Sequence, residues 1–158
     1  MAITETLARN YANLIEEGIL PREIENSGTK NDIFYTGIHA IKTPHVVTPH
    51  SLKLLIHEEE IANALQAEGI NVPKMHGVHD YNGTPFLVME KLRLTPFKKL
   101  TREERAEASR QYAKQIGEAR DAGLYSEDID WKTNYGFDNK KGKGFFYDFE
   151  DWKRESVA

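Results

Sequence analysis

The sequence contains no cysteine, no long apolar run and no large excess of either charge. Without cysteine, the fold cannot depend on disulfides or on thiolate ligands. No apolar stretch comes near the roughly 18 residues that a membrane-spanning helix needs. With 25 acidic and 21 basic residues, neither sign is concentrated enough to predict a nucleic-acid or membrane surface. We therefore expect a soluble, cytoplasmic protein that binds neither nucleic acid nor a membrane.

The 158 residues are enough for one domain with its own hydrophobic core. Apolar residues at steps of three and four predict an N-terminal helix over residues 3–18 and a second helix from Ser51, as N-cap, to Glu68. A third helix is expected up to Gly123, because Thr101 and Glu104 have the spacing of a capping box.

Several short segments rich in β-branched and aromatic residues predict antiparallel strands. A hairpin is expected around Thr36 and Gly37, and the turn YNGT separates two further strands. A last pair of strands flanks the turn NKKGKG. The expected strands outside the first hairpin cover residues 74–79, 85–92, 135–138 and 145–149. The sequence therefore predicts an α+β fold.

The stretch FFYDFEDWKRE near the C-terminal end places acidic residues among aromatic ones. Asp148 stands between Tyr147 and Phe149, and a carboxylate in such a strand pattern needs a compensating partner if it is buried. That partner is either a metal ion or a basic side chain in a structural salt bridge.

Four motifs in this order resemble those of protein kinases. The first, HAIK, ends in Lys42, which the resemblance implies binds the α- and β-phosphates of ATP. The second is the glutamate of the following helix, which in kinases forms an ion pair with that lysine. Glu58 matches it, because apolar residues follow it three, four and seven positions later, although Glu59 and Glu60 are adjacent alternatives.

The third motif, PFLVMEKL, resembles the strand and hinge that contact adenine in kinases. Met89 then occupies the gatekeeper-like position, and the main chain from Glu90 to Leu92 binds the base. The stretch NSGTKNDIFY stands where kinases have their glycine-rich loop, and Gly28 matches one of its glycines.

The fourth motif, AGLYSEDIDWKTNYGFD, resembles the kinase catalytic loop. It implies that Asp128 is the catalytic base and that Lys132 stabilises the transferring phosphoryl group. Asp130 is an alternative base, because the gap from Asp128 to the following asparagine is one residue longer than usual and DWK resembles D-L-K. Asn134 and Asp148 of the DFE segment are the implied magnesium ligands.

The resemblance implies a minimal protein-kinase-like fold of the type found in bacteriophage kinases and secreted bacterial effectors. Residues 1–20 would be an N-terminal helix, residues 23–92 an N-lobe sheet with helix C and the hinge, and residues 93–158 a truncated helical C-lobe. The implied activity is transfer of phosphate from Mg-ATP to serine or threonine of a protein of a host or of the same cell. A phage or effector protein would act in the host cytoplasm.

Two other functions remain open. The poor glycine loop and the irregular catalytic loop also suit a pseudokinase that binds a partner protein with or without nucleotide. Aminoglycoside and choline kinases share the fold, and EGINVPKMHGV resembles their sequences. We interpret the six histidines as ordinary surface residues, and NKKGKG as a solvated hairpin tip or a contact for an acidic substrate.

Overall fold

A computed structural model describes the backbone over residues 22–24, 31–35, 38–44, 46–81, 83–127 and 134–155. The expected helix at residues 3–18 and the turn at Thr36 and Gly37 lie outside the described residues. The chain divides into two compact units, of which the first contains the residues up to Glu59 together with Lys74–Lys91. The second contains Glu60–Pro73 and the residues from Leu92 onward.

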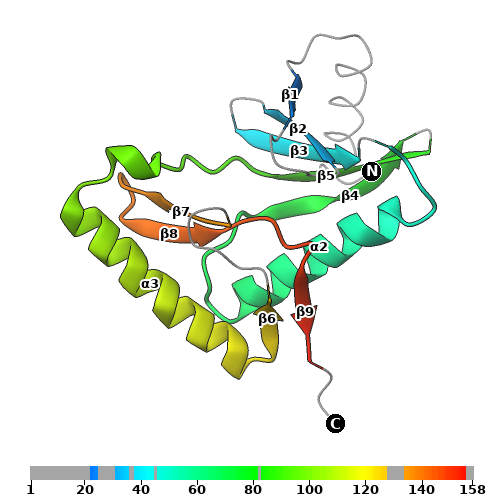
Figure 1. The fold of residues 1–158 in the computed structure, drawn as a ribbon. Helices are drawn as coiled ribbons and strands as arrows, with labels where there is room; N and C mark the ends of the chain where they lie inside the picture. Colours follow the sequence, from blue (N-terminus) through cyan, green and yellow to red (C-terminus); the bar gives the residue numbers. More distant parts are fainter. Residues whose placement is uncertain are drawn as a thin grey trace. The chain divides into compact units, whose positions relative to one another are not determined.

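The first unit is built on a five-stranded antiparallel sheet with the strand order β1-β2-β3-β5-β4 (Figure 1). Both expected strand pairs are present, one with Phe34 opposite Ile41 and the other with Thr84 opposite Tyr81. The strand that was expected to reach Leu92 ends at Glu90. The strands are β1 (Arg22–Ile24), β2 (Asn31–Tyr35), β3 (His39–Pro44), β4 (Met75–Tyr81) and β5 (Thr84–Glu90).

Strands β3 and β5 lie in the interior of the sheet and are buried on both faces. Ile41 and its cross-strand neighbour Val88 are fully buried on one face. Lys42 and its neighbour Leu87 are buried on the other face, because successive side chains of a strand point to opposite sides. Position 42 is therefore an interior position that carries a cation.

Helix α2 (Ser51–Ala67) begins at Ser51, so the prediction that Ser51 is its N-cap was wrong. The Ser51 hydroxyl oxygen instead accepts a hydrogen bond from the Thr48 amide at 2.9 Å, which ties the preceding loop to the helix. After the helix, Gly69 has a φ of 79°, and the Ile70 amide donates to the Leu65 carbonyl at 3.1 Å. This is a common glycine-based helix ending.

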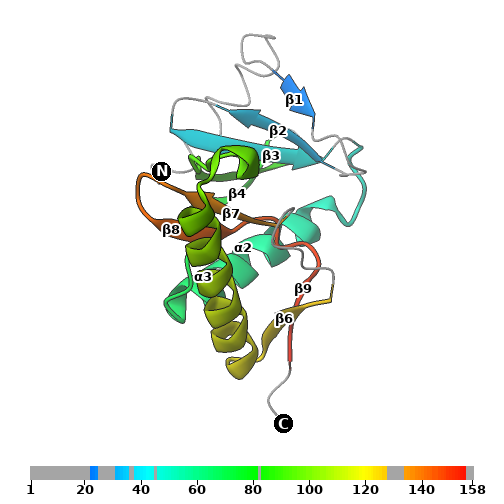
Figure 2. The same ribbon diagram turned by 60° about the vertical axis from the view of Figure 1, so that its left-hand side comes forward.

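The second unit contains helix α3 (Arg102–Asp121) and two two-stranded antiparallel sheets (Figure 2). The expected capping box is confirmed, since the Thr101 hydroxyl accepts from the Glu104 amide and the Glu104 carboxylate accepts from the Thr101 amide. Neither α-helix of the described part of the chain is long and apolar enough to cross a membrane. The other elements are η1 (Phe97–Lys99), β6 (Leu124–Ser126), β7 (Tyr135–Asp138), β8 (Lys143–Phe146) and β9 (Trp152–Arg154).

The last expected strand is shorter than its aromatic pattern suggested. Strand β8 ends at Phe146, and Asp148 has a φ of 65°, which is incompatible with a continuing strand. The chain then forms β9, which pairs with β6 and was not expected from the sequence. A three-residue strand is too short to show an alternating pattern.

Aromatic side chains form much of the core of the second unit. The Phe146 ring lies 4.8 Å from that of Tyr135 and 5.5 Å from that of Trp152, between ring centroids. Helix α3 packs against this hairpin through Tyr112, and the side-chain amide of Gln111 contacts the turn, donating to Gly142 O and accepting from Gly144 N. The β7–β8 hairpin is thus held firmly on α3.

Gly144 is required at its position by the ring of Tyr135. A Cβ at residue 144 would overlap the Tyr135 hydroxyl and ring, whereas a Cβ at Gly117, on α3, would meet nothing within 4 Å. We expect Gly144→Ala to lower the free energy of unfolding by about 1–3 kcal/mol. Gly117→Ala, the control, should raise it by about 0.5–1 kcal/mol because alanine favours helix. Urea denaturation measures both, and equal effects would contradict the packing described here.

Candidate functional site

A buried ion pair between Lys42 and Glu58 lies in the first unit. The Lys42 ammonium donates to both carboxylate oxygens of Glu58, at 2.9 Å to Oε1 and 3.2 Å to Oε2. The two side chains are only 5% and 3% exposed. The pair joins the central strand β3 to helix α2 and places a positive charge at a fixed point on the sheet.

The helix periodicity explains why Glu58 is the partner. The buried residues of α2 include Leu55, Glu58, Ala62 and Leu65, which recur at steps of three and four. Glu59 is half-buried and Glu60 is exposed, so neither lies on this face. The structure therefore pairs Lys42 with Glu58, the glutamate that the spacing of the following apolar residues favoured, and not with Glu59 or Glu60.

Met89 lies on the same face of the sheet as Lys42. Met89 is opposite Ala40 in the β3–β5 ladder, and Ala40 precedes Lys42 by two residues, so all three side chains point to one side. The predicted gatekeeper-like residue and the predicted phosphate-binding lysine are thus neighbours along one surface.

Two of the three predicted hinge amides are already used by the sheet. The Glu90 amide donates to the Lys74 carbonyl at 2.8 Å, and the Lys91 amide donates to the Ile38 carbonyl at 3.0 Å. Leu92 follows the end of β5, and within the described residues its amide has no hydrogen-bond acceptor. Of these three amides, that of Leu92 is therefore the one left to donate a hydrogen bond to a ligand.

The interpretation of all six histidines as surface residues was wrong for His39. His39 is 9% exposed, and its ring meets that of His76 edge to face at a centroid distance of 5.0 Å. Burial, and then the nearby His76, lower the pKa of His39. Burial, and then Lys74, lower the pKa of His76, while Glu90 opposes that shift. The two rings are therefore favoured in their neutral forms.

Asn134 and Asp148 come together at one end of the β7–β8 hairpin. Tyr135 is opposite Phe146, and the Tyr147 amide donates to the Asn134 carbonyl at 3.1 Å, which continues the ladder by one step. Asp148 follows directly and is the non-glycine residue with a positive φ in the described part of the chain. Residues fourteen positions apart are thereby brought to one place in the second unit.

An asparagine and an aspartate offer only hard oxygen ligands, which suit magnesium, calcium or manganese. No three histidine, cysteine, aspartate or glutamate residues cluster as a metal site within the described residues. Magnesium needs few protein ligands, because it retains water and takes oxygen ligands from a bound phosphate. The pair can therefore hold this ion only together with such a ligand.

The remaining predicted residues cannot be placed. Gly28, Asp128, Asp130 and Lys132 lie outside the described residues. The described strands that flank the predicted catalytic loop are β6, which ends at Ser126, and β7, which begins at Tyr135.

Comparison with known proteins shows the fold but not the family. No known family model matches the sequence, and no curated protein matches it. The fold is similar to a crystal structure of monomeric WbdD, with a TM-score of 0.59 and 16% identity over 79% of this chain and 33% of that chain.

Two further WbdD structures give the same result. One, described as the bifunctional kinase-methyltransferase WbdD, has a TM-score of 0.58 and 16% identity over 80% of this chain and 31% of that one. The other, a complex with the kinase inhibitor LY294002, has a TM-score of 0.57 and 18% identity over 85% and 33%. The chain spans about a third of the length of these proteins. Its described residues thus form an α+β fold with antiparallel sheets that resembles part of a kinase-containing protein.

The burial of the ion pair predicts a non-additive effect on stability. Lys42→Met or Glu58→Leu alone should each lower the free energy of unfolding by about 3–5 kcal/mol, because each leaves a buried charge without its partner. The double variant should lose less than either single variant, since no charge remains buried. Urea denaturation of all four proteins gives the coupling energy.

A matched exposed pair provides the control for this cycle. Lys114 and Glu118 are 3.8 Å apart on α3 and are 67% and 42% exposed. Lys114→Met and Glu118→Leu should couple by less than about 1 kcal/mol. Additive losses at Lys42 and Glu58 would contradict a buried pair.

The backbone of Asp148 predicts which replacement is best tolerated. Asp148→Gly and Asp148→Ala both remove the carboxylate, but only glycine adopts a positive φ without strain. We expect the glycine variant to be more stable by about 1–2 kcal/mol in thermal or urea unfolding. At the nearby Asp151 the alanine variant should instead be more stable than the glycine variant, because alanine restricts the unfolded chain more than glycine does. A glycine variant at 148 no more stable than the alanine variant would exclude the left-handed conformation.

Proposed function

We propose that this chain is a minimal kinase-like phosphotransferase that uses Mg-ATP. The observation that carries the proposal is the buried Lys42–Glu58 ion pair. Such a pair gains little stability over an apolar replacement, so its presence favours a use for the charge. The partial likeness to WbdD supports the same reading at the level of the fold.

In this proposal the first unit is the N-lobe and Lys42 binds the α- and β-phosphates. A lysine on a flexible stem is a mobile point charge, and the bidentate contact with Glu58 holds it on the sheet. Pre-orienting a charge in this way avoids much of the cost of ordering it during the reaction. The adenine would lie against Ala40 and Met89 and accept a hydrogen bond from the Leu92 amide.

The second unit would be the truncated C-lobe and would supply the metal site and the base. Asn134 and Asp148 would hold magnesium on the phosphate oxygens. Asp128, or Asp130, would accept the proton of the attacking hydroxyl, and Lys132 would balance charge on the transferring phosphoryl group. Gly28 would belong to the loop that covers the phosphates.

We propose a serine or threonine hydroxyl of a protein as the acceptor. A pseudokinase that binds nucleotide without chemistry shares the Lys42–Glu58 pair and differs only in turnover. Phosphate transfer therefore has to be measured separately from nucleotide binding.

The test is transfer of labelled γ-phosphate from ATP, to the protein itself or to added protein substrates. We expect activity that EDTA abolishes and added magnesium restores. Asp148→Ala should lower the rate by about 100-fold or more, because it removes a ligand of the ion that balances the developing charge. Asp151→Ala, which alters an exposed aspartate three residues away, should retain the rate.

Three results would separate the possibilities. Label retained by Asp148→Ala would refute the assigned metal site. A thermal shift with Mg-ATP that Lys42→Met removes, without transfer in the unaltered protein, would identify a nucleotide-binding pseudokinase. Neither a shift nor transfer would refute the proposed function altogether.

A further inference from the structure

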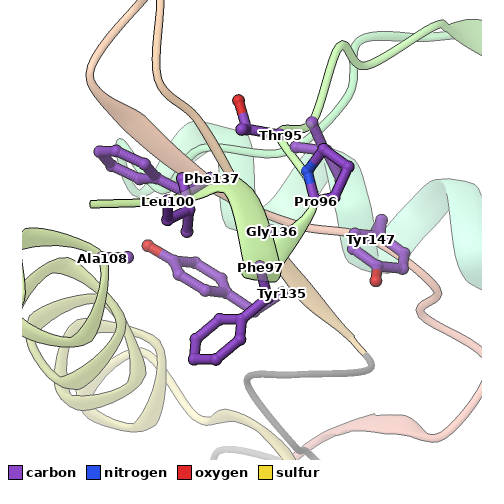
Figure 3. Close-up of a pocket in the computed structure, with 10 residues that line it drawn as sticks. Thr95, Pro96, Phe97, Leu100, Ala108, Tyr135, Gly136, Phe137 and Tyr147 are labelled. Carbon is purple, nitrogen blue, oxygen red and sulfur yellow. The ribbon is translucent and has the colours of Figure 1, made fainter. Parts of the chain in front are cut away.

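A cavity of about 220 Å³ lies in the second unit, and neither Asn134 nor Asp148 lines it, although their chain neighbours Tyr135 and Tyr147 do. Figure 3 shows that side chains from the segment before α3, from α3 and from β7 surround it. Its walls include Pro96, Phe97, Leu100, Ala108 and Phe137. The proposed function gives this cavity no role.

The size and lining of the cavity suit one aromatic side chain. No charged residue lines it, and its polar lining side chains are hydroxyls. An apolar protein cavity of about 150 Å³ is known to accommodate benzene, so this volume is sufficient for a phenyl or phenol ring. Pro96 and Phe97 are exposed, and Phe97 is 39% exposed, so these walls reach the solvent.

Exposed cations stand beside the cavity on two elements. Lys98 and Lys99 follow Phe97 directly and are exposed. Arg105 stacks over the Phe97 ring, with its guanidinium carbon 4.7 Å from the ring centroid, and donates to the Phe97 carbonyl at 3.3 Å. These three residues give η1 and the first turn of α3 a positive outer surface.

The β7–β8 turn contributes the other cations. The Asn139 amide donates to the Thr95 hydroxyl at 3.2 Å, which ties the turn to a residue that lines the cavity. Lys140 and Lys141 are exposed on this turn. Their amides donate to the buried carboxylate of Asp138, at 3.0 Å and 3.2 Å, so this acid faces the backbone of the turn.

Most acidic side chains near this surface are already engaged. Glu104 forms the capping box with Thr101, Glu107 is ion-paired on α3, and Glu103 is the other acid at the start of α3. The whole chain has a net charge of −4, so the five cations on η1, α3 and the β7–β8 turn make this surface more basic than the chain as a whole. An apolar cavity with a basic rim is complementary to an acidic segment that contains an aromatic residue.

We propose that this cavity and its basic rim bind an acidic polypeptide segment, with one aromatic side chain of the segment inserted into the cavity. The aromatic ring supplies affinity by apolar burial, and the acidic neighbours pair with Lys98, Lys99, Lys140 and Lys141. We take the partner to be a protein, because an apolar cavity suits an aromatic side chain and the exposed cations beside it suit acidic neighbours of that side chain. This inference does not depend on phosphate transfer.

The test uses fluorescein-labelled peptides and fluorescence anisotropy with the full chain. The probe GDEDFDEDG should bind saturably at about 50 mM NaCl and more weakly at about 500 mM. Replacing its phenylalanine by alanine should weaken binding by about tenfold or more, because the ring is no longer buried. Lys98→Glu with Lys99→Glu should also weaken binding of the phenylalanine peptide about tenfold or more.

Matched variants test whether the peptide binds through the cavity and its basic rim or only through the overall charge of the protein. Lys53→Glu with Lys114→Glu makes the same change of charge at exposed sites elsewhere and should alter binding less than about twofold. Ala108→Leu should fill the cavity and make the two peptides bind equally, in a variant whose folding is checked by circular dichroism. Asp148→Gly removes the proposed metal ligand without straining the backbone and should bind both peptides normally, which distinguishes this proposal from the proposed function.

Four results would overturn the proposal. They are equal binding of the phenylalanine and alanine peptides, equal weakening in the two charge-reversal variants, no saturable binding up to about 1 mM peptide, and displacement of the peptide by adenosine. The last result would assign the cavity to the base of a nucleotide instead.

Discussion

The ion pair between Lys42 and Glu58 constrains the first unit more than any other contact described here. Two opposite charges removed from water are tolerated only when their geometry is close to ideal, because each loses its hydration. Strand β3 and helix α2 must therefore keep one relative register, in which residue 42 faces residue 58. The ladder between β3 and β5 also places Ala40 and Met89 on the face of the sheet that carries Lys42.

Local patterns predicted most helices and hairpins in the described residues, and non-local pairing accounts for the errors. The Thr101–Glu104 capping box and the β7 bounds followed from short motifs. The short strand β9 could not be predicted, because it forms only where β6 is available to pair with it. Burial of His39 likewise depends on β4 and β5, which are distant in sequence.

Some features of the candidate site could be predicted from the sequence and others could not, again because some depend on non-local pairing. Resemblance to kinases selected Lys42 and a short run of glutamates, and the phase of the helix then determined the partner. The convergence of Asn134 and Asp148 followed from expecting a hairpin between them, which the structure has. The involvement of the Glu90 and Lys91 amides in the sheet could not be anticipated, because it requires the pairing partners Lys74 and Ile38.

The backbone conformation of Asp148 explains how an acidic residue can lie between buried aromatic residues. Phe146 and Phe149 are both buried, and a regular strand cannot alternate correctly through the two residues between them. The positive φ at Asp148 reverses the chain locally, so that Phe149 returns to the core while Asp148 stays half-buried beside Asn134. A left-handed aspartate costs free energy that glycine would avoid, and such strain is concentrated at functional positions. Retaining aspartate at this position implies a use for its carboxylate, and the proposed magnesium site would be one such use.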